Sequence, residues 1–126
     1  MAESATQKRG GKALQASIKG LRTSRKKIES AIAVKKIQSK SYKKEMREKA
    51  RVSRKLVVSR ERKALYDASK VVVSAPTIGD INAVKQLIKK VEQVAVAGAT
   101  WKAGFKLVKT LATDAGKLGQ DVKIKK

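Results

Sequence analysis

The stretch "VVVSAPTIGDI", residues 71–81, divides the sequence into two parts that both show helical periodicity. Pro76 and Gly79 are unfavourable inside a helix, and Thr77 or Asp80 can cap a helix that follows. Because this interruption is short, the helices on its two sides are predicted to run antiparallel. The sequence therefore predicts an all-α protein that turns at this stretch.

A long basic helical arm is predicted over residues 13–74, before the turn at residues 75–80, because Gly20 is its only glycine and it has no proline. At 100° per residue, apolar and small residues fall within an arc of roughly 80°. This arc contains Leu14, Leu21, Ile28, Ile32, Tyr42, Met46, Ala50, Val57, Ala64 and Ala68. The phase continues through possible breaks near residue 20 and residues 38–41. We therefore favour an unbroken helix whose first part packs on another subunit over one that folds back into a third helix.

A packing helix is predicted over residues 81–115, where apolar residues recur every three or four positions. Gly116 and Gly119 predict its end and leave a basic tail at 116–126, and residues 1–12 are predicted to form a flexible basic leader. The residues predicted to pack or assemble are Leu14, Leu21, Ile28, Ile32, Tyr42, Met46, Val57, Val91, Val94, Trp101, Phe105 and Val108.

The net charge of the chain is +22, from 32 basic and 10 acidic residues. Residues 1–66 hold 21 of the basic and 5 of the acidic residues, a net charge of +16. Such self-repulsion opposes compaction unless an anion offsets it, so a nucleic acid is the expected partner. The uneven distribution predicts that the first half of the chain makes most of the contacts.

Basic residues of the arm also keep helical phase, within an arc of about 100° beside the apolar one. Such a stripe could also be an ordinary solvated helix face that binds nothing. Solvated faces usually alternate positive and negative charges, however, because like charges four residues apart destabilise a helix by ~0.2–0.5 kcal/mol per pair. The stripe therefore favours a bound polyanion. The residues predicted to bind nucleic acid are Lys36, Lys40, Lys43, Lys44, Arg47, Arg51, Arg54, Lys55, Arg22, Arg25 and Lys26.

The kind of binding is predicted from the residue types. With 24 Lys and 8 Arg and only four aromatic residues, the chain suits phosphate contacts better than base recognition or base stacking. Since duplex DNA has two phosphates per base pair, one subunit can neutralise about eleven base pairs. Non-specific, salt-dependent coating is expected, with DNA favoured over RNA.

Catalytic and metal chemistry is not expected from this sequence. The chain has no Cys and no His, and its Ser-x-x-Lys matches at Ser24 and Ser41 lack the companion motifs of serine acyl-enzymes. We expect no enzyme activity, no catalytic residue, no metal, no cofactor and no small-molecule substrate. The window 91–108 is the most membrane-like segment, but Glu92, Lys102 and Lys106 argue against a spanning helix, and no membrane partner is expected.

The layout resembles that of the all-helical major capsid proteins of filamentous archaeal viruses. The resemblance covers the basic run Lys12–Arg62, the turn "SAPTIGD" and the apolar run Ile81–Ala115. It implies a coat protein that wraps DNA, assembles with identical or related coat subunits, and resides in the virion as nucleocapsid. Outside a virion, the expectation is a cytoplasmic nucleoprotein. Two alternatives stay open: a ribosomal-type RNA-binding helical protein, and a virion-internal genome-delivery protein with a membrane-active helix at residues 84–112.

Overall fold

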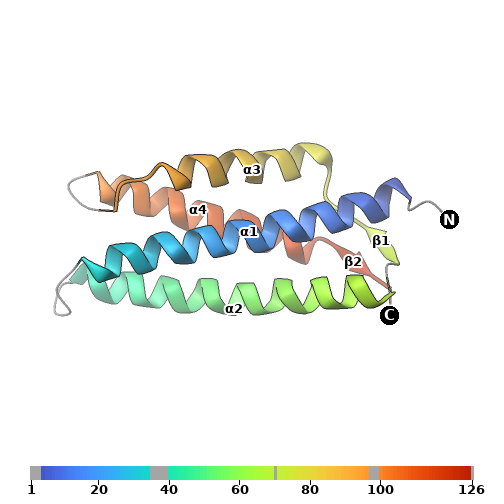
Figure 1. Cartoon of the computed structure of the whole chain (residues 1–126), viewed down its shortest axis with the longest axis horizontal. Helices are drawn as coiled ribbons and strands as arrows, with labels where there is room; N and C mark the ends of the chain where they lie inside the picture. Colours follow the sequence, from blue (N-terminus) through green and yellow to red (C-terminus); the bar gives the residue numbers. More distant parts are fainter. Residues whose placement is uncertain (1–3, 35–39, 70, 97–99, 126) are drawn as a thin grey trace.

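Four helices follow one another in alternating directions and pack side by side, with a short β-ribbon at one end (Figure 1). The structure is a computed structural model and describes residues 4–34, 40–69, 71–96 and 100–125. Within these residues the predicted all-α class is confirmed. The helices are α1 (Ala5–Ala33), α2 (Lys40–Ser69), α3 (Ile78–Glu92) and α4 (Trp101–Gln120), and the strands are β1 (Val72–Ser74) and β2 (Lys123–Ile124).

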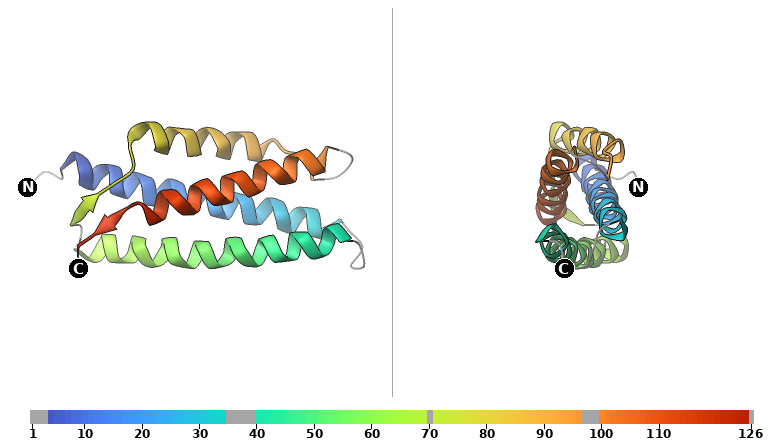
Figure 2. Two further views of the ribbon diagram at one scale, coloured as in Figure 1. Left: turned by 180° about the vertical axis from the view of Figure 1, so that it is seen from behind. Right: turned by 90° about the vertical axis from the view of Figure 1, so that its left-hand side faces the viewer.

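The arrangement of the helices is clearest along the bundle axis. Seen end-on, α1 and α4 lie on opposite sides, and each lies between α2 and α3 (Figure 2). The hydrophobic core runs along the inside of all four helices. Among the described residues, a groove lies between each two helices that adjoin around the outside of the bundle.

The first helix begins earlier than the sequence predicts. Ser4 caps α1 by accepting a hydrogen bond from the backbone N–H of Gln7, and the Gln7 side chain accepts one from the backbone N–H of Ser4. This reciprocal capping box satisfies two N–H groups that would otherwise lack partners at the helix start. The predicted flexible leader over residues 1–12 is therefore wrong from residue 5 onward. Residues 1–3 lie outside the described residues.

The predicted unbroken arm over residues 13–74 is wrong. α1 ends at Ala33 and α2 begins at Lys40, and the two helices pack antiparallel, as in the alternative with a break near 38–41. Folding back within one chain lets α1 bury Leu14, Leu21 and Ile28 completely without another subunit. Six residues lie between the two helices, and residues 35–39 among them, which include the predicted contact Lys36, lie outside the described part of the structure.

The apolar arc does not continue through α2. Its inward face contains Glu45, Val52, Leu56, Ser59 and Tyr66, all of them buried. The predicted packing residues on this helix face outward instead, with Met46 39% and Val57 53% exposed. The prediction failed because helical phase is interrupted between the end of α1 at Ala33 and the start of α2 at Lys40, so positions in α1 do not determine which face of α2 is buried. Tyr42 is half-buried.

Small residues allow α1 to approach α4 and α2 closely. A Cβ atom on Gly20 would lie 2.8 Å from Ala115 Cβ, and one on Gly119 would lie 2.6 Å from Ser17 Oγ. Ser17 also shares a buried hydrogen bond of 2.8 Å with Ser59, which joins α1 to α2 at the same level. These contacts require glycine at both positions, because any larger side chain would separate the helices.

The predicted single packing helix over residues 81–115 is divided into two helices. The side chain of Thr77 caps α3, as anticipated, and α3 ends at Glu92, eight residues before α4 begins at its cap Thr100. The candidate membrane-active segment 84–112 therefore spans two antiparallel helices (Figure 1). Among the described residues, no helix has both the length and the apolar character needed to cross a membrane.

The packing residues predicted for the C-terminal half face the core. Val91, Trp101 and Val108 are buried, and Val94 and Phe105 are partly buried against them. In the first half, Ile32 is also partly buried against the core. The rings of Trp101 and Phe105 lie one helical turn apart with centroids separated by 5.6 Å. These residues therefore hold the bundle itself together.

The predicted basic tail over 116–126 is structured as far as residue 125. Gly116 and Gly119 lie inside α4, which continues to Gln120, and β2 then pairs antiparallel with β1. Two arginines fix this end of the molecule: Arg9 donates to the Pro76 carbonyl and Arg62 to the Val122 carbonyl. These two side chains stabilise the fold, and neither belongs to the predicted nucleic-acid-binding set.

A buried polar pair connects α2 to the start of α4. Trp101 Nε1 donates a hydrogen bond to Glu45 Oε1, and the two residues are 5% and 1% exposed. The lysines around Glu45 in the sequence predict an exposed polar position for it, and this expectation is wrong because the structure buries its side chain. A carboxylate in this position is stabilised by the N–H donor, since burying it without hydrogen bonds is costly.

Replacing Trp101 with phenylalanine is expected to lower the free energy of unfolding by about 2–3 kcal/mol. The variant removes a hydrogen bond to a charged group and leaves the Glu45 carboxylate buried without this donor. Urea unfolding followed by circular dichroism measures the change. In the double variant W101F/E45Q, where position 45 is neutral, part of the loss should be recovered. If the effects of W101F and E45Q on the free energy of unfolding simply add in the double variant, a direct interaction between the two side chains is contradicted.

Candidate nucleic-acid interface

The predicted basic stripe of α2 is mostly accessible. Lys43, Lys44, Arg47 and Arg54 are exposed, while Arg51 is half-buried. The side chain of Arg51 donates to the Glu48 carboxylate at 2.8 Å and to Thr113 Oγ1 at 3.2 Å. This arginine is therefore already held by α2 and α4, and it is less available to a phosphate than the sequence suggests.

Two other members of the predicted set differ from the stripe. The methylene chain of Lys55 lies over Gly116 of α4, with Cδ 3.1 Å from the position of a Cβ atom there. Lys40 is the first residue of α2, and the placement of its side chain lies outside the described part of the structure. Helical phase alone does not distinguish Lys55, which lies against α4, from the exposed basic residues of α2.

The α2/α4 groove collects the outward residues of the stripe. It has a volume of about 600 Å³. Five basic residues and one acidic residue line it, together with one small and one aromatic residue: Lys44, Arg47, Arg51, Arg54 and Lys109, then Glu48, then Ala50 and Phe105. The contribution of α4 was not predicted, because Lys109 comes from a part of the sequence with a much lower net charge.

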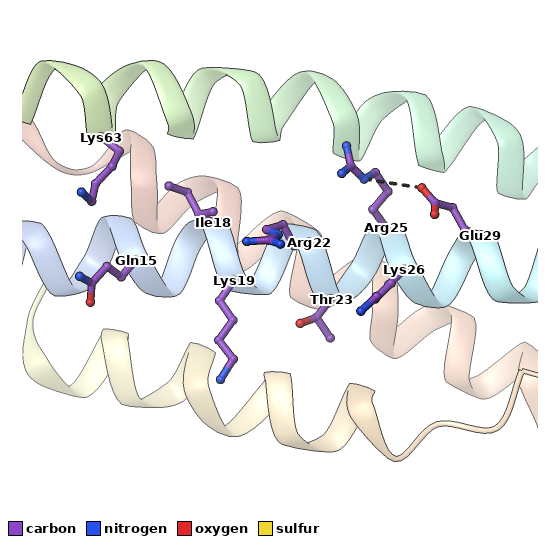
Figure 3. Close-up of a pocket in the computed structure, with 9 residues that line it drawn as sticks. All are labelled: Gln15, Ile18, Lys19, Arg22, Thr23, Arg25, Lys26, Glu29 and Lys63. Carbon is purple, nitrogen blue, oxygen red and sulfur yellow. Dashed lines mark ion pairs between the residues drawn. The ribbon is translucent and has the colours of Figure 1, made fainter.

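The α1/α2 groove is a larger hollow, of about 730 Å³, along the outer face of α1. Arg22, Arg25 and Lys26, which were predicted on the arm, all line it. In Figure 3, Lys19 and Lys26 extend from α1 towards α3, while Arg25 and Glu29 lie on the side of α2. The groove is completed by Lys63 from α2.

The α1/α3 groove adjoins the previous one, because Gln15 and Lys19 line both. It has a volume of about 390 Å³ and adds Lys12 from α1 and Lys85 and Lys89 from α3. The two grooves together contain eight basic residues and two acidic ones, Glu29 and Glu92. We call this continuous surface the α1 face.

Some of these charges are partly offset by ion pairs. Glu29 lies 3.6 Å from Arg25 and 4.0 Å from Lys49, and Lys63 lies 2.8 Å from Asp67. All of these pairs are substantially exposed, so each stabilises the fold only weakly. Among the residues that the structure describes, Lys19, Arg22 and Lys26 belong to no ion pair, so their charges remain available to a ligand.

The α3/α4 groove has the opposite character. Asp80, Asp114 and Asp121 line it with Lys117 as its one basic residue. Three of the chain's ten acidic residues thus face the same hollow. No group of acidic side chains in the described ranges is arranged to hold a metal ion. The net charge of this groove is negative, whereas that of the other three grooves is positive.

The α1 face could have been found from spacing alone. Lys12, Lys19, Arg22 and Lys26 are separated by seven, three and four residues, which places them along one line on a helix. The predicted set contains Arg22 and Lys26 of this row but not Lys12 and Lys19, because it was centred on the densest run of charge, in α2. By contrast, Lys85, Lys89 and Lys63 join the site only through tertiary packing.

The fold and these grooves define a basic four-helix bundle with an accessible cationic surface on several sides. Comparisons with models of protein families, with curated proteins and with solved structures find no match for this chain. The geometry and charge of the grooves are therefore the features of the molecule that bear on its function.

Proposed function

We propose that this protein is a structural nucleic-acid-binding protein that coats or packages a nucleic acid, with duplex DNA favoured, through non-specific contacts to phosphates. The observation that carries the proposal is the α1 face, where eight basic residues outnumber two acidic ones along a continuous groove. Lys19, Arg22 and Lys26 lie there outside any ion pair of the described chain. A concave surface with fixed cations is suited to a sugar-phosphate backbone.

The residue types favour positioning without sequence readout. The α1 face is dominated by lysine, whose ammonium acts as a point charge for phosphate. No aromatic residue lines this face, so its grooves contain no platform on which bases could stack. Backbone contacts of this kind fix a protein on a duplex but carry no sequence information. We therefore expect similar affinities for unrelated sequences.

A coat requires contacts between subunits as well as with nucleic acid. The outward apolar residues of α2, Met46, Val57 and Val58, are 39%, 53% and 38% exposed. We propose that neighbouring copies meet over these residues when a shared nucleic acid offsets their charge. A virion, with the protein as nucleocapsid or capsid subunit, is the setting that we propose, and a cytoplasmic nucleoprotein is the alternative setting.

The proposal is tested by mixing the purified protein with two unrelated DNA duplexes of equal length, an RNA duplex and a folded RNA. Equal affinities for the two DNA duplexes and formation of filaments or condensed particles in electron micrographs are expected. A protein that stays monomeric and prefers the folded RNA would instead be an RNA-binding protein of the ribosomal type. Failure to bind any of the four would overturn the proposal.

A further inference from the structure

The basic surfaces lie on two opposite sides of the bundle. The α1 face includes the outer side of α1, whereas the α2/α4 groove opens on the side of α4. In the end-on view of Figure 2, α1 and α4 lie on opposite sides of the bundle, with their inner faces packed against each other at Gly20 and Ala115. A surface meant for one ligand would concentrate its charge on one side. Two separate concentrations of positive charge point to two ligand segments.

The α1 face is long enough to hold a duplex segment. Lys12 and Lys26 are fourteen residues apart on a straight helix, which corresponds to about 21 Å. A duplex carries one phosphate per about 1.7 Å of its axis, so roughly twelve phosphates lie within that length. Gln15 and Thr23 add neutral hydrogen-bonding groups to the same groove.

The α2/α4 groove offers a second, independent set of cations. Lys44, Arg47, Arg54 and Lys109 line it, and ion pairing in the described chain holds only Arg51 among its basic residues. None of these side chains lines the α1 face. Substitutions can therefore neutralise one surface and leave the other unchanged.

One duplex cannot occupy both surfaces at the same time. A helix with its side chains is about 10–12 Å across, so two layers of helices place the surfaces roughly 20 Å apart. A duplex could pass from the α1 face to the α4 side over either α3 or α2. The acidic α3/α4 groove, with Asp80, Asp114 and Asp121, repels phosphates on the path over α3. A duplex on the α4 side is thus confined to the part next to α2.

We propose that each subunit holds two duplex segments at once, one on the α1 face and one in the α2/α4 groove, and so bridges them. This inference rests on the proposed function and adds to it a mechanism of packaging. A bridging bundle condenses a long duplex by linking distant segments, and this linking adds to the proposed contacts between subunits without depending on them. In a virion or nucleoprotein, bridging brings adjacent turns of the genome together.

The test is a capture experiment with one duplex immobilised and a second, labelled duplex in solution. Three variants of the full chain carry the same loss of three charges. The first is K19Q/R22Q/K26Q on the α1 face, and the second is R47Q/R54Q/K109Q in the α2/α4 groove. The third, K90Q/K123Q/K125Q, is a control in which the replaced lysines are exposed and line none of the four grooves.

Wild type and the control are expected to bind the immobilised duplex and to capture the labelled one. Each groove variant should still bind the immobilised duplex, but its capture of the second duplex should fall at least tenfold at equal amounts of bound protein. Capture by either groove variant at the wild-type level would overturn the inference, because bridging would then come from one surface or from subunit association. Absence of binding to the first duplex by wild type would instead contradict the proposed function.

Discussion

Replacing Gly20 with valine is expected to lower the free energy of unfolding by about 2–3 kcal/mol, as overpacking of a tight helix contact does. A Cβ atom at this position would lie 2.8 Å from Ala115 Cβ and 3.2 Å from Leu111 Cδ1. The Ala115 methyl group is attached directly to the backbone of α4, so it cannot move aside without moving the helix. The gain in helix propensity on replacing glycine, less than about 1 kcal/mol, does not offset this cost.

The matched control for this substitution is Gly79→Ala, in the first turn of α3. The atom nearest to an added Cβ there is Thr77 Oγ1 at 3.7 Å, an ordinary van der Waals contact. This variant should be as stable as wild type or more stable by up to about 1 kcal/mol. Urea unfolding monitored by circular dichroism compares the two. If the Gly20 variant were as stable as the control, α1 would not pack against α4 as described.

The contact between Gly20 and Ala115 also distinguishes the observed bundle from a structure with an extended N-terminal arm. In an unbroken helix over residues 13–74 that packs on another subunit, Gly20 would not meet Ala115 of the same chain. The destabilisation should therefore be independent of protein concentration in the folded-back bundle. An effect that changes with protein concentration would indicate that the contact forms between subunits.

Local signals in the sequence were sufficient for some parts of the fold. Thr77 was correctly predicted as a possible cap, since a side-chain oxygen before a helical segment satisfies its free N–H groups. Leu14, Leu21, Ile28 and Val108 were correctly assigned to packing, because their spacing within a single helix fixes a common face. These predictions depend only on residues within about one helix.

Other parts of the fold depend on contacts between different helices, which the spacing of residues within one helix does not predict. Glu45 was expected on the surface, and its burial depends on Trp101, which lies 56 residues later and donates its N–H. Similarly, Met46 lies outward because α2 packs as a separate helix, and apolar periodicity carried over from α1 does not determine the face that a separate helix buries. Sequence patterns thus located the helical segments better than the faces that α2 buries.

The candidate nucleic-acid interface could likewise be predicted only in part from the sequence. Arg22, Arg25 and Lys26 were predicted as nucleic-acid contacts, and they come together on the α1 face with bases from two other helices. Whether they bind nucleic acid stays a prediction. The role of Lys85 and Lys89 could not be foreseen, because their proximity to α1 arises from packing of α3 beside it.

Neutralising the α1 face is expected to weaken binding of duplex DNA to that face by about 500-fold at 0.1 M salt. Each phosphate contact releases about 0.9 counterion, which favours each contact roughly eightfold at that salt concentration. The variant K19Q/R22Q/K26Q removes three such cations, none of which forms an ion pair within the described chain. Fluorescence anisotropy with a short labelled duplex, long enough for one protein surface, measures the change.

The control K90Q/K123Q/K125Q has the same net charge of +19, obtained from +22 by removing three lysines. It should bind at most a fewfold more weakly than wild type, because only the long-range field is reduced. Equal weakening in both variants would mean that total charge, and not the arrangement on the α1 face, determines affinity. Circular dichroism spectra should show that both variants keep the helical content of wild type.

The most direct measurement of the central claim is the slope of the logarithm of the binding constant against the logarithm of salt concentration. Duplex DNA is titrated with wild type, the α1-face variant and the control at several salt concentrations. If the α1 face contacts phosphates, its variant should have a slope less steep by about 2–3, while the control keeps the wild-type slope. An unchanged slope in the α1-face variant would contradict the assignment of this face as the phosphate-binding surface.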